Sequence, residues 1–298
     1  MKKFLTIMAT VALMLSVAAC GEKDDHKSSD IVIPPAPLAD KAKKIDFEQL
    51  GESKMPVFTN PGNDVNYRIH QIEFTEDSRF IVRSEEFTVS AASKATPNII
   101  TFIGKYTAQS NGVYTINMFG IASVTVSGNN VTVKTTSQSD QSVTAVVTDT
   151  QASGTSQINA SRTWTVSSCI LKVSGNGVSI EKAFTNGCDI YEIAKYAKDN
   201  GVKEIDPEEF KSYSVKEIIF TGANTIAADL GAEVYSGTYS LLGESCTYRF
   251  TSGKNIALFP ETSTGLLQFT TQSNSVMTIN NTVKGYTGSI ELNLAIAK

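Results

Sequence analysis

The stretch YRIHQIEFT at residues 67–75 returns in altered form as YSVKEIIFT at residues 213–221. Both copies begin with tyrosine and end with phenylalanine and threonine, and hydrophobic residues alternate imperfectly with polar ones between these ends. Such alternation is typical of a β-strand that is buried on one face. Because the copies lie far apart in the chain, they indicate a duplicated domain rather than a solenoid of small units.

A second pair of matching blocks follows the first pair in the same order. FIGKYTAQSNGVYTI at residues 102–116 is similar to YSGTYSLLGESCTYRF at residues 235–250. Gly104 and Gly237 each begin a Gly-x-Tyr sequence, in which we expect the glycine to allow a bend or a close backbone approach and the tyrosine to pack beside it. This strand is loosely similar to the opening strand of lipocalin-like barrels, which carries Gly-x-Trp, and the resemblance implies a barrel.

Short segments rich in β-branched residues recur through most of the chain. The clearest is VTVSGNNVTV at residues 124–133, where two alternating runs flank a polar turn, as expected for a hairpin. Strands that recur with turn signals at short spacing favour antiparallel pairing over β-α-β units. The sequence therefore predicts a mainly β protein with two related antiparallel β domains, each a barrel or a sandwich.

One segment has a convincing helical pattern. In CDIYEIAKYAKDNG at residues 188–201, Asp189 and Glu192 have the spacing of a capping box, and hydrophobic residues fall on one face. In DPEEF at residues 206–210, Asp206 precedes a proline at a position where helices often begin. We expect these segments to form a helix pair between the two domains.

The N-terminus carries a targeting pattern. Two lysines precede a hydrophobic run that ends in VAAC at residues 17–20 and turns at once into charged residues. The order of positive charge, apolar core, small residues and cysteine resembles the lipobox signal of bacterial lipoproteins. The resemblance implies cleavage after Ala19 and lipid attachment to Cys20, which would anchor the chain to a membrane. An ordinary secretory signal with an incidental cysteine is the alternative.

The charges that follow Cys20 add a weaker cue. Lys23-Asp24-Asp25 resembles the signal that sends lipoproteins of Bacteroidota to the outer face of the outer membrane. A solvated tether without sorting information is the alternative, because charges beside an anchor stay out of the apolar layer. The whole chain is similar to duplicated, β-rich surface lipoproteins of Bacteroidota, which implies an outer-membrane anchor with the protein at the cell surface or facing the periplasm.

These patterns divide the chain into four parts. We expect a signal peptide at residues 1–19 and a lipidated, flexible tether at residues 20–40, where several prolines favour an extended spacer. A first β domain is expected at residues 41–175. A second β domain is expected at residues 176–298, beginning with the helical segment.

Charge and cysteine usage narrow the classes of partner. The 298-residue chain has 26 Lys and Arg against 30 Asp and Glu and no basic stripe, so we expect no nucleic-acid partner. Cys169, Cys188 and Cys246 lack zinc-ligand spacing, and we expect no metal and no cofactor. One disulfide with one free thiol, or three buried thiols, are both compatible with the sequence.

Patterns of catalytic residues are lacking. The chain has no Gly-x-Ser-x-Gly sequence, and His70 is the only histidine outside the predicted tether. We expect His70 to be a strand residue facing solvent. Glu85 and Glu86 are neighbours on a predicted strand and would point to opposite faces, so they do not form a glycosidase pair. The sequence therefore favours a protein that is not an enzyme.

Trp164, in RTWTVSS at residues 162–168, is the candidate ligand-binding residue, because an indole face stacks well on a sugar ring. Burial in the core is the alternative. We expect a non-enzymatic extracellular binding module for a polysaccharide or an envelope protein. A structural or accessory subunit of a surface assembly, such as a lipidated pilin, is the second hypothesis, and a hydrolase is the third.

Overall fold

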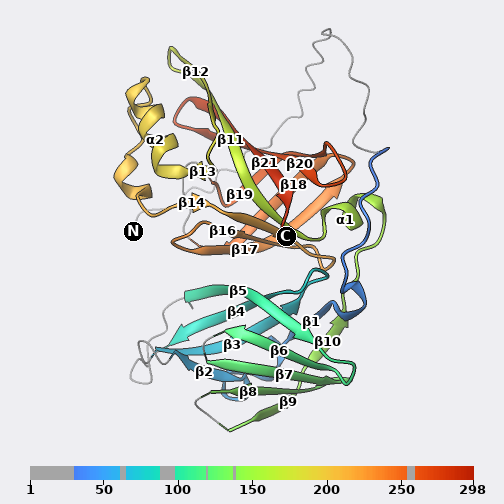
Figure 1. Cartoon of the computed structure of the whole chain (residues 1–298). Helices are drawn as coiled ribbons and strands as arrows, with labels where there is room; N and C mark the ends of the chain where they lie inside the picture. The colour runs from blue at the N-terminus through green and yellow to red at the C-terminus, as the bar shows by residue number, and fades with distance from the viewer. Residues whose placement is uncertain (1–29, 61–64, 88–97, 119, 137–138, 254–258) are drawn as a thin grey trace, which may run out of the picture.

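The computed structural model describes residues 30–60, 65–87, 98–118, 120–136, 139–253 and 259–298. Two antiparallel β barrels stand one above the other, the N-terminal barrel below the C-terminal one in Figure 1. The predicted mainly β fold with two related domains is confirmed, and both domains are barrels rather than sandwiches. The predicted signal cleavage site at Ala19 and the predicted lipid attachment site at Cys20 lie outside the described residues.

The first barrel is nearly closed. Its strands are β1 (Lys43–Asp46), β2 (Val57–Asn60), β3 (Val65–Phe74), β4 (Arg79–Phe87), β5 (Asn98–Ala108), β6 (Val113–Met118), β7 (Ile121–Ser127), β8 (Asn130–Thr135), β9 (Gln141–Thr144) and β10 (Val146–Asp149). Strand β9 pairs with β8 at one end of the sheet, and β10 pairs with β1 at the other end. Ala145 joins β9 to β10, so the chain connects the two ends of the sheet. The Gln141 amide adds a bridge to β2, accepting from the Val57 N–H at 3.0 Å and donating to the Val57 carbonyl at 2.7 Å.

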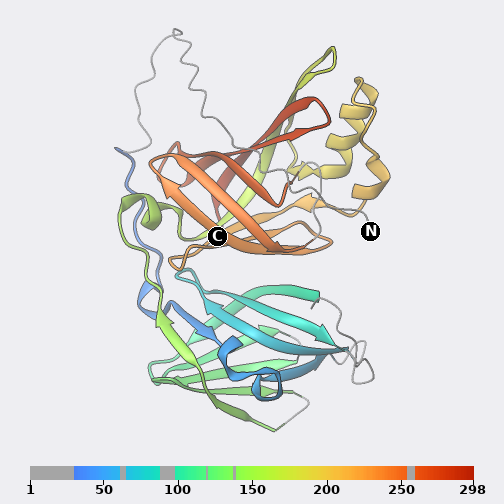
Figure 2. The ribbon, with the colours of Figure 1, turned by 180° about the vertical axis from the view of Figure 1, so that it is seen from behind.

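The second barrel closes through eight strands. They are β11 (Thr163–Gly175), β15 (Glu217–Phe220), β16 (Thr225–Asp229), β17 (Val234–Leu242), β18 (Ser245–Ser252), β19 (Thr262–Phe269), β20 (Asn274–Val283) and β21 (Tyr286–Ile296). Closure depends on β11, which pairs with β15 along its first residues and with β21 along most of its length. Strand β12 (Val178–Phe184) pairs with the far end of β11, and this hairpin projects beyond the barrel in both views (Figure 1 and Figure 2).

Short helical segments and one further strand pair complete the fold. They are η2 (Ala39–Lys41), η3 (Glu48–Leu50), η4 (Glu52–Lys54), α1 (Thr155–Ala160), β13 (Cys188–Asp189), α2 (Ile190–Asp199), η5 (Pro207–Phe210) and β14 (Ser214–Val215). The predicted helix start is confirmed, because the Asp189 carboxylate accepts from the Glu192 N–H at 3.1 Å. Asp206 likewise caps η5. The predicted hairpin at residues 124–133 is formed by β7 and β8.

The repeated sequence produces the same hairpin in both barrels. Strands β3 and β4 enclose Ser78, and β15 and β16 enclose Asn224, both of which have a positive φ. The Tyr106 hydroxyl donates to the Thr75 carbonyl at 2.6 Å, and the Tyr239 hydroxyl donates to the Thr221 carbonyl at 2.8 Å. The tyrosine of each Gly-x-Tyr strand therefore links that strand to the threonine at the turn of the first hairpin in the same repeat.

The glycine of the same strands lies where a side chain does not fit. A Cβ atom on Gly237 would stand 1.9 Å from the Arg249 carbonyl oxygen, across a bulge between β17 and β18. A Cβ atom on Gly104 would stand 2.5 Å from the Phe80 ring. The predicted close backbone approach is thus present at Gly237, whereas at Gly104 a neighbouring side chain fills the space.

Strand β11 belongs to the second barrel, although the sequence places it at the end of the first domain. The predicted boundary at residues 175 and 176 falls in the turn between β11 and β12, inside the second sheet. The first sheet ends at Asp149, and α1 lies on the connection to Thr163. The physical reason is the pairing of β11 with the C-terminal strand β21, which lies too far along the chain to appear in a local pattern.

Part of the predicted tether is packed against the second barrel. Ile33 is fully buried and joins the core of that barrel. The Ile33 N–H donates to the Asn159 side chain at 2.8 Å, and the Arg162 guanidinium donates to the Pro34 carbonyl at 2.7 Å. Residues 31–36 are therefore held by α1 and its flanks rather than being a flexible spacer, because Ile33 gains burial and the backbone gains specific partners.

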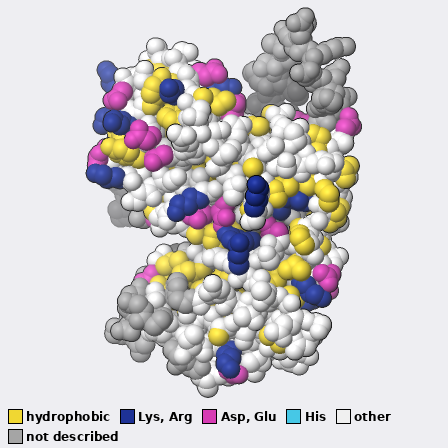
Figure 3. Space-filling view, in the orientation of Figure 1, with side chains coloured by type: hydrophobic (Ala, Val, Ile, Leu, Met, Phe, Trp, Pro, Cys, Tyr) yellow, Lys and Arg dark blue, Asp and Glu magenta, His cyan; other side chains and the backbone are white. Residues whose placement is uncertain are grey.

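The barrels meet through equivalent faces of their repeated hairpins. Ile81 of the first barrel forms a fully buried cluster with Ile219 and Ala227 of the second. Around it, the Thr101 hydroxyl contacts the Ser236 hydroxyl at 2.7 Å. Charged side chains also gather along this junction (Figure 3). The junction thus combines a small apolar centre with polar contacts that fix the relative orientation of the barrels.

Glu73 places a carboxyl group, whose ionisation costs free energy when it is buried, at this junction. Its side chain is fully buried, and no hydrogen bond of standard geometry reaches either carboxyl oxygen from the described residues. Burial raises the pKa of Glu73, and the nearby hydroxyls of Thr221 and Thr225 and the charge of Lys44 lower it by less. Burial of an ionised carboxylate costs free energy. The folded protein is therefore more stable at acidic pH, where Glu73 is neutral, and it loses this stability as the pH rises through the raised pKa of Glu73.

We expect Glu73→Gln to stabilise the protein in a pH-dependent manner. Glutamine keeps the shape without the charge, so the variant and the natural protein should differ little at about pH 4, near the usual pKa of glutamate. At about pH 8 the variant should have the higher free energy of unfolding, by roughly 1–3 kcal/mol. Denaturant unfolding across this range measures the difference, with the exposed Glu181→Gln as control. A difference independent of pH would contradict the prediction.

Candidate functional site

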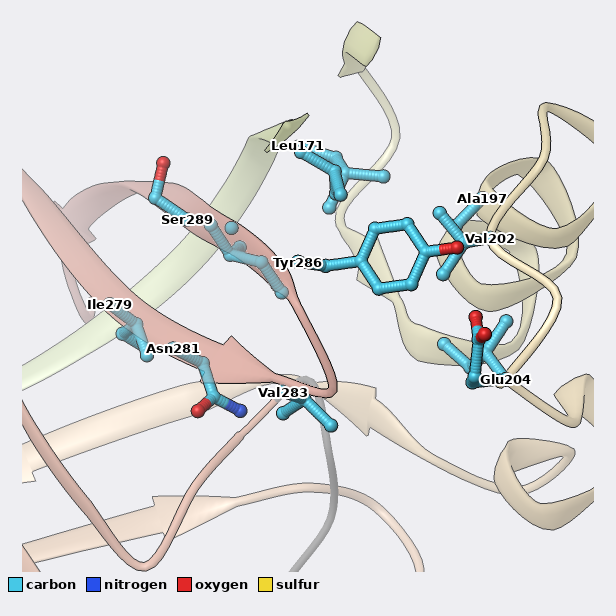
Figure 4. A pocket seen from close by; sticks show the side chains of 13 residues that line it. Leu171, Ala197, Val202, Glu204, Ile279, Asn281, Val283, Tyr286 and Ser289 are labelled. Atoms are coloured by element: carbon cyan, nitrogen blue, oxygen red, sulfur yellow. The ribbon is translucent and has the colours of Figure 1, made fainter. Parts of the chain in front are cut away.

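An apolar cavity of about 100 Å³ lies at one end of the second barrel, beneath the α2 segment (Figure 4). Helix α2 and the residues after it supply one wall, and strands β11, β20 and β21 supply the others. The side chains that line the cavity include Leu171, Ala197, Val202, Glu204, Ile279 and Tyr286. The Tyr286 ring points across the cavity toward Ala197 and Val202 (Figure 4).

The amphipathic pattern of α2 explains why the helix covers this end of the barrel. Ile190, Ile193, Ala194 and Ala197 are buried on one face and join the barrel core. Near the C-terminal end of the helix, the Tyr196 ring meets Phe184 at the end of β12 edge to face, at a centroid distance of 6.1 Å. The helix is therefore held by the barrel rim and by the projecting hairpin.

The chemistry of the lining is mostly aliphatic. Leu171 and Ile279 are buried, and Tyr286 is 8% exposed, so the inner end of the cavity offers hydrocarbon and one aromatic ring. Glu204 is exposed and Val283 is 37% exposed, so the outer end meets solvent beside a carboxylate. Drug-sized ligands occupy sites of about 300–1,000 Å³, whereas a dry engineered cavity of about 150 Å³ binds benzene. The cavity is smaller than both and therefore matches a short aliphatic chain.

Trp164, the candidate binding residue of the sequence, lies in the core of the second barrel. Its side chain is fully buried, its indole N–H donates to the Ala160 carbonyl at 2.9 Å, and its ring lies 6.1 Å from that of Phe269. Trp164 pairs with Ile218 in the sheet. Ile72 is the equivalent of Ile218 in the first repeat, and it pairs with Ile45. This position matches the core alternative and leaves no exposed indole face for a sugar.

The cavity residues were not among the sequence candidates. Helical periodicity identifies Ala197 as a buried position, but nothing in the local pattern shows that it faces Tyr286 across a gap. Tyr286 follows a turn at Gly285 and begins an alternating strand, and its sequence looks like that of other strands in this chain. Only the closure of the barrel brings these residues together.

His70 lies between two carboxylates rather than in open solvent. Its ring nitrogens stand 3.6 Å from Glu48 and 3.4 Å from Glu85, and its side chain is 16% exposed. Glu85 also forms an ion pair with Arg68 at 2.5 Å. Within the described part of the chain, no group of three or more His, Cys, Asp and Glu residues is arranged to hold a metal ion.

A second hollow, of about 510 Å³, lies at the junction of the barrels. It is lined by the start of β5 around Ile100 and by the loop before β17 around Ala232. Asn98 and Gly253 also line this hollow, and both adjoin segments that lie outside the described residues.

Comparisons with known proteins do not assign this chain to a family. No protein-family model matches the sequence, and no curated protein matches it. Among the helices in the described ranges, none is long and apolar enough to cross a membrane. The cavity beneath α2 is therefore the feature of the described structure that points most directly to a function.

Proposed function

We propose that this chain is a non-enzymatic, lipid-anchored binding protein of the bacterial outer membrane, and that its second barrel holds a small apolar group in the cavity beneath α2. The single observation that carries the binding proposal is an aliphatic cavity with one solvent-facing carboxylate, at the end of a closed barrel. The anchor is supported by the lipobox-like sequence that ends at Cys20. Surface exposure is supported by the charged residues after it.

The lining favours an aliphatic ligand over a bare polysaccharide. Sugar rings need exposed aromatic faces and many hydrogen-bond partners, whereas Leu171, Val173 and Ile279 offer hydrocarbon. Glu204 at the outer end would accept a hydrogen bond from the ligand or pair with a cationic group. A short alkyl chain, either free or carried by an envelope protein or a substituted glycan, fits this arrangement.

The projecting β12 strand favours binding over assembly by strand exchange. Its outer edge has no partner strand among the described residues, and it carries exposed Glu181 and Lys182. Charged side chains at an edge strand disfavour pairing with another chain. A subunit that polymerises through this edge would need an apolar or uncharged strand there.

We expect Ala197→Met to abolish ligand binding by filling the cavity. The natural chain from Ser28 onward should unfold at a higher temperature with a short alkylamine or alkyl alcohol, and a concentration of 100 times Kd corresponds to about 2.7 kcal/mol. Thermal unfolding with alkyl ligands of increasing length, simple sugars and mucin glycans measures the shift. Lys195→Met, on the exposed face of the same helix, is the matched control.

Three outcomes decide this proposal. A shift with alkyl ligands that Ala197→Met removes and Lys195→Met keeps would support it. A shift that survives in Ala197→Met would place the ligand elsewhere. A higher unfolding temperature with sugars alone would contradict the apolar cavity as the binding site and would favour a glycan ligand.

A further inference from the structure

Cys169 and Cys188 lie side by side in the second barrel. A parallel bridge joins Ser168 to Gly187, and the two cysteines are the next residues along each strand. The Gly187 N–H donates to the Ser167 carbonyl at 2.9 Å, which holds the two segments together. The Cys169 thiol contacts the Gly187 carbonyl oxygen at 3.7 Å, so its sulfur points toward the segment that carries Cys188.

This placement brings the two thiols into contact, as a disulfide bond requires. The bridge between Ser168 and Gly187 brings the two backbones to the strand spacing of about 4.7–4.9 Å one residue before the cysteines, and disulfides adopt Cα separations of about 4.4–6.8 Å. Both thiols are buried, with exposed fractions of 1% for Cys169 and 0% for Cys188, and they contact each other.

We propose that Cys169 and Cys188 form a disulfide bond when the protein folds in an oxidising compartment, and that this bond ties the start of α2 to β11. Each thiol loses one hydrogen, and the two electrons reduce a small-molecule disulfide or a disulfide-bearing oxidoreductase to two thiols. One S–S bond is formed in the protein and one is broken in the oxidant. The bond stands on the geometry alone, whereas its effect on the cavity rests on the proposed function.

The position of Cys188 gives the bond a structural consequence. Cys188 precedes Asp189, the residue that caps α2, and α2 begins at Ile190. A bond to β11 would therefore fix the helix over the cavity at its first turn, whereas the reduced protein holds this turn through packing and the short β13–β14 pairing. The oxidised protein should keep α2 closed at temperatures where the reduced protein releases it.

The contact between the thiols also indicates when the bond forms. The hydrogen bond with Cys169 and burial together raise the pKa of the Cys188 thiol, so the folded, reduced protein holds little reactive thiolate. Oxidation should therefore occur during folding, before the pair is buried. The third cysteine, Cys246 on β18, faces Leu241 and Gly265 in register and is expected to stay a thiol.

The test uses the chain from Ser28 onward, which holds every described residue and lacks Cys20, unfolded and refolded with oxidised glutathione or with excess reductant. We expect the oxidised product to be lighter by two hydrogens, to show one reactive thiol after denaturation, and to yield a linked peptide containing Cys169 and Cys188. Its unfolding midpoint should exceed that of the reduced protein by roughly 5–10 °C, the usual effect of closing a loop of this size. Cys246→Ala should retain this difference.

The double variant Cys169→Ala/Cys188→Ala should unfold at one temperature under both conditions. If that variant does not fold, the comparison of oxidised and reduced natural protein decides by itself. Three reactive thiols after oxidative refolding, or a link to Cys246, would overturn the inference. A protein that forms the bond but shifts with no alkyl ligand would leave the inference intact and refute the apolar binding site, so the two failures are distinguishable.

Discussion

Replacing Trp164 with alanine is expected to lower the free energy of unfolding by about 3–5 kcal/mol, the usual cost of removing a large aromatic side chain from a core. Trp164 is fully buried at the start of β11, the strand that closes the second barrel. The substitution would leave a cavity beside Phe269 and remove the donor to the Ala160 carbonyl. Denaturant unfolding monitored by circular dichroism measures the loss.

A matched variant separates packing from surface chemistry. Trp164→Phe keeps much of the buried volume and loses only the indole N–H, so its cost should be clearly smaller than that of Trp164→Ala. If Trp164 were a surface platform for sugars, both variants would change stability by less than about 0.5 kcal/mol, as substitutions away from buried features do. Loss of glycan binding with unchanged stability would contradict the core position.

Replacing Glu217 with alanine is expected to cost about 3–5 kcal/mol, because it would leave the largely buried Arg79 without its ion-pair partner at the junction of the barrels. Arg79 and Glu217 form an ion pair between β4 and β15, and each side chain is 16% exposed. Burial lowers the pKa of Arg79, and the charges of Asp77 and Asp229 oppose this effect only in part. Calorimetric unfolding of the whole chain measures the cost.

The exposed pair Arg249–Glu261 supplies the control. Its side chains are 68% and 52% exposed and lie 3.5 Å apart, so Glu261→Ala should change the free energy of unfolding by less than about 1 kcal/mol. In Glu217→Ala, the two barrels should also unfold as more separate transitions, because the junction holds them together. Equal small effects from both variants would show that the junction contributes little to stability.

Local sequence patterns predict the elements and their duplication. The repeated strands that end in phenylalanine and threonine, the Gly-x-Tyr strands, the hairpin at residues 124–133 and the cap at Asp189 are all present as predicted. These features depend on turn chemistry, capping and side-chain alternation within about ten residues. The same local rules act in both copies, which is why the duplication can be recognised from the order of the residues alone.

Features that depend on distant parts of the chain could not be predicted in the same way. The position of β11 in the second barrel depends on pairing with β21, and the burial of Ile33 depends on Asn159. The sequence placed β11 in the first domain and Ile33 in the tether because both segments have ordinary local patterns. The junction carboxyl of Glu73 likewise looks like any polar strand residue until a second barrel covers it.

The sequence by itself determined that this protein is β-rich and duplicated and contains one amphipathic helix, and it predicts a lipid anchor at Cys20, which stays a prediction. Only the tertiary structure decided that the domains are barrels, that Trp164 is core, that an aliphatic cavity lies beneath α2, and that Cys169 meets Cys188. The physical reason is that strands and turns are specified by neighbouring residues. Closure of a barrel, and every cavity and contact that closure creates, is specified by pairs of residues far apart in the chain.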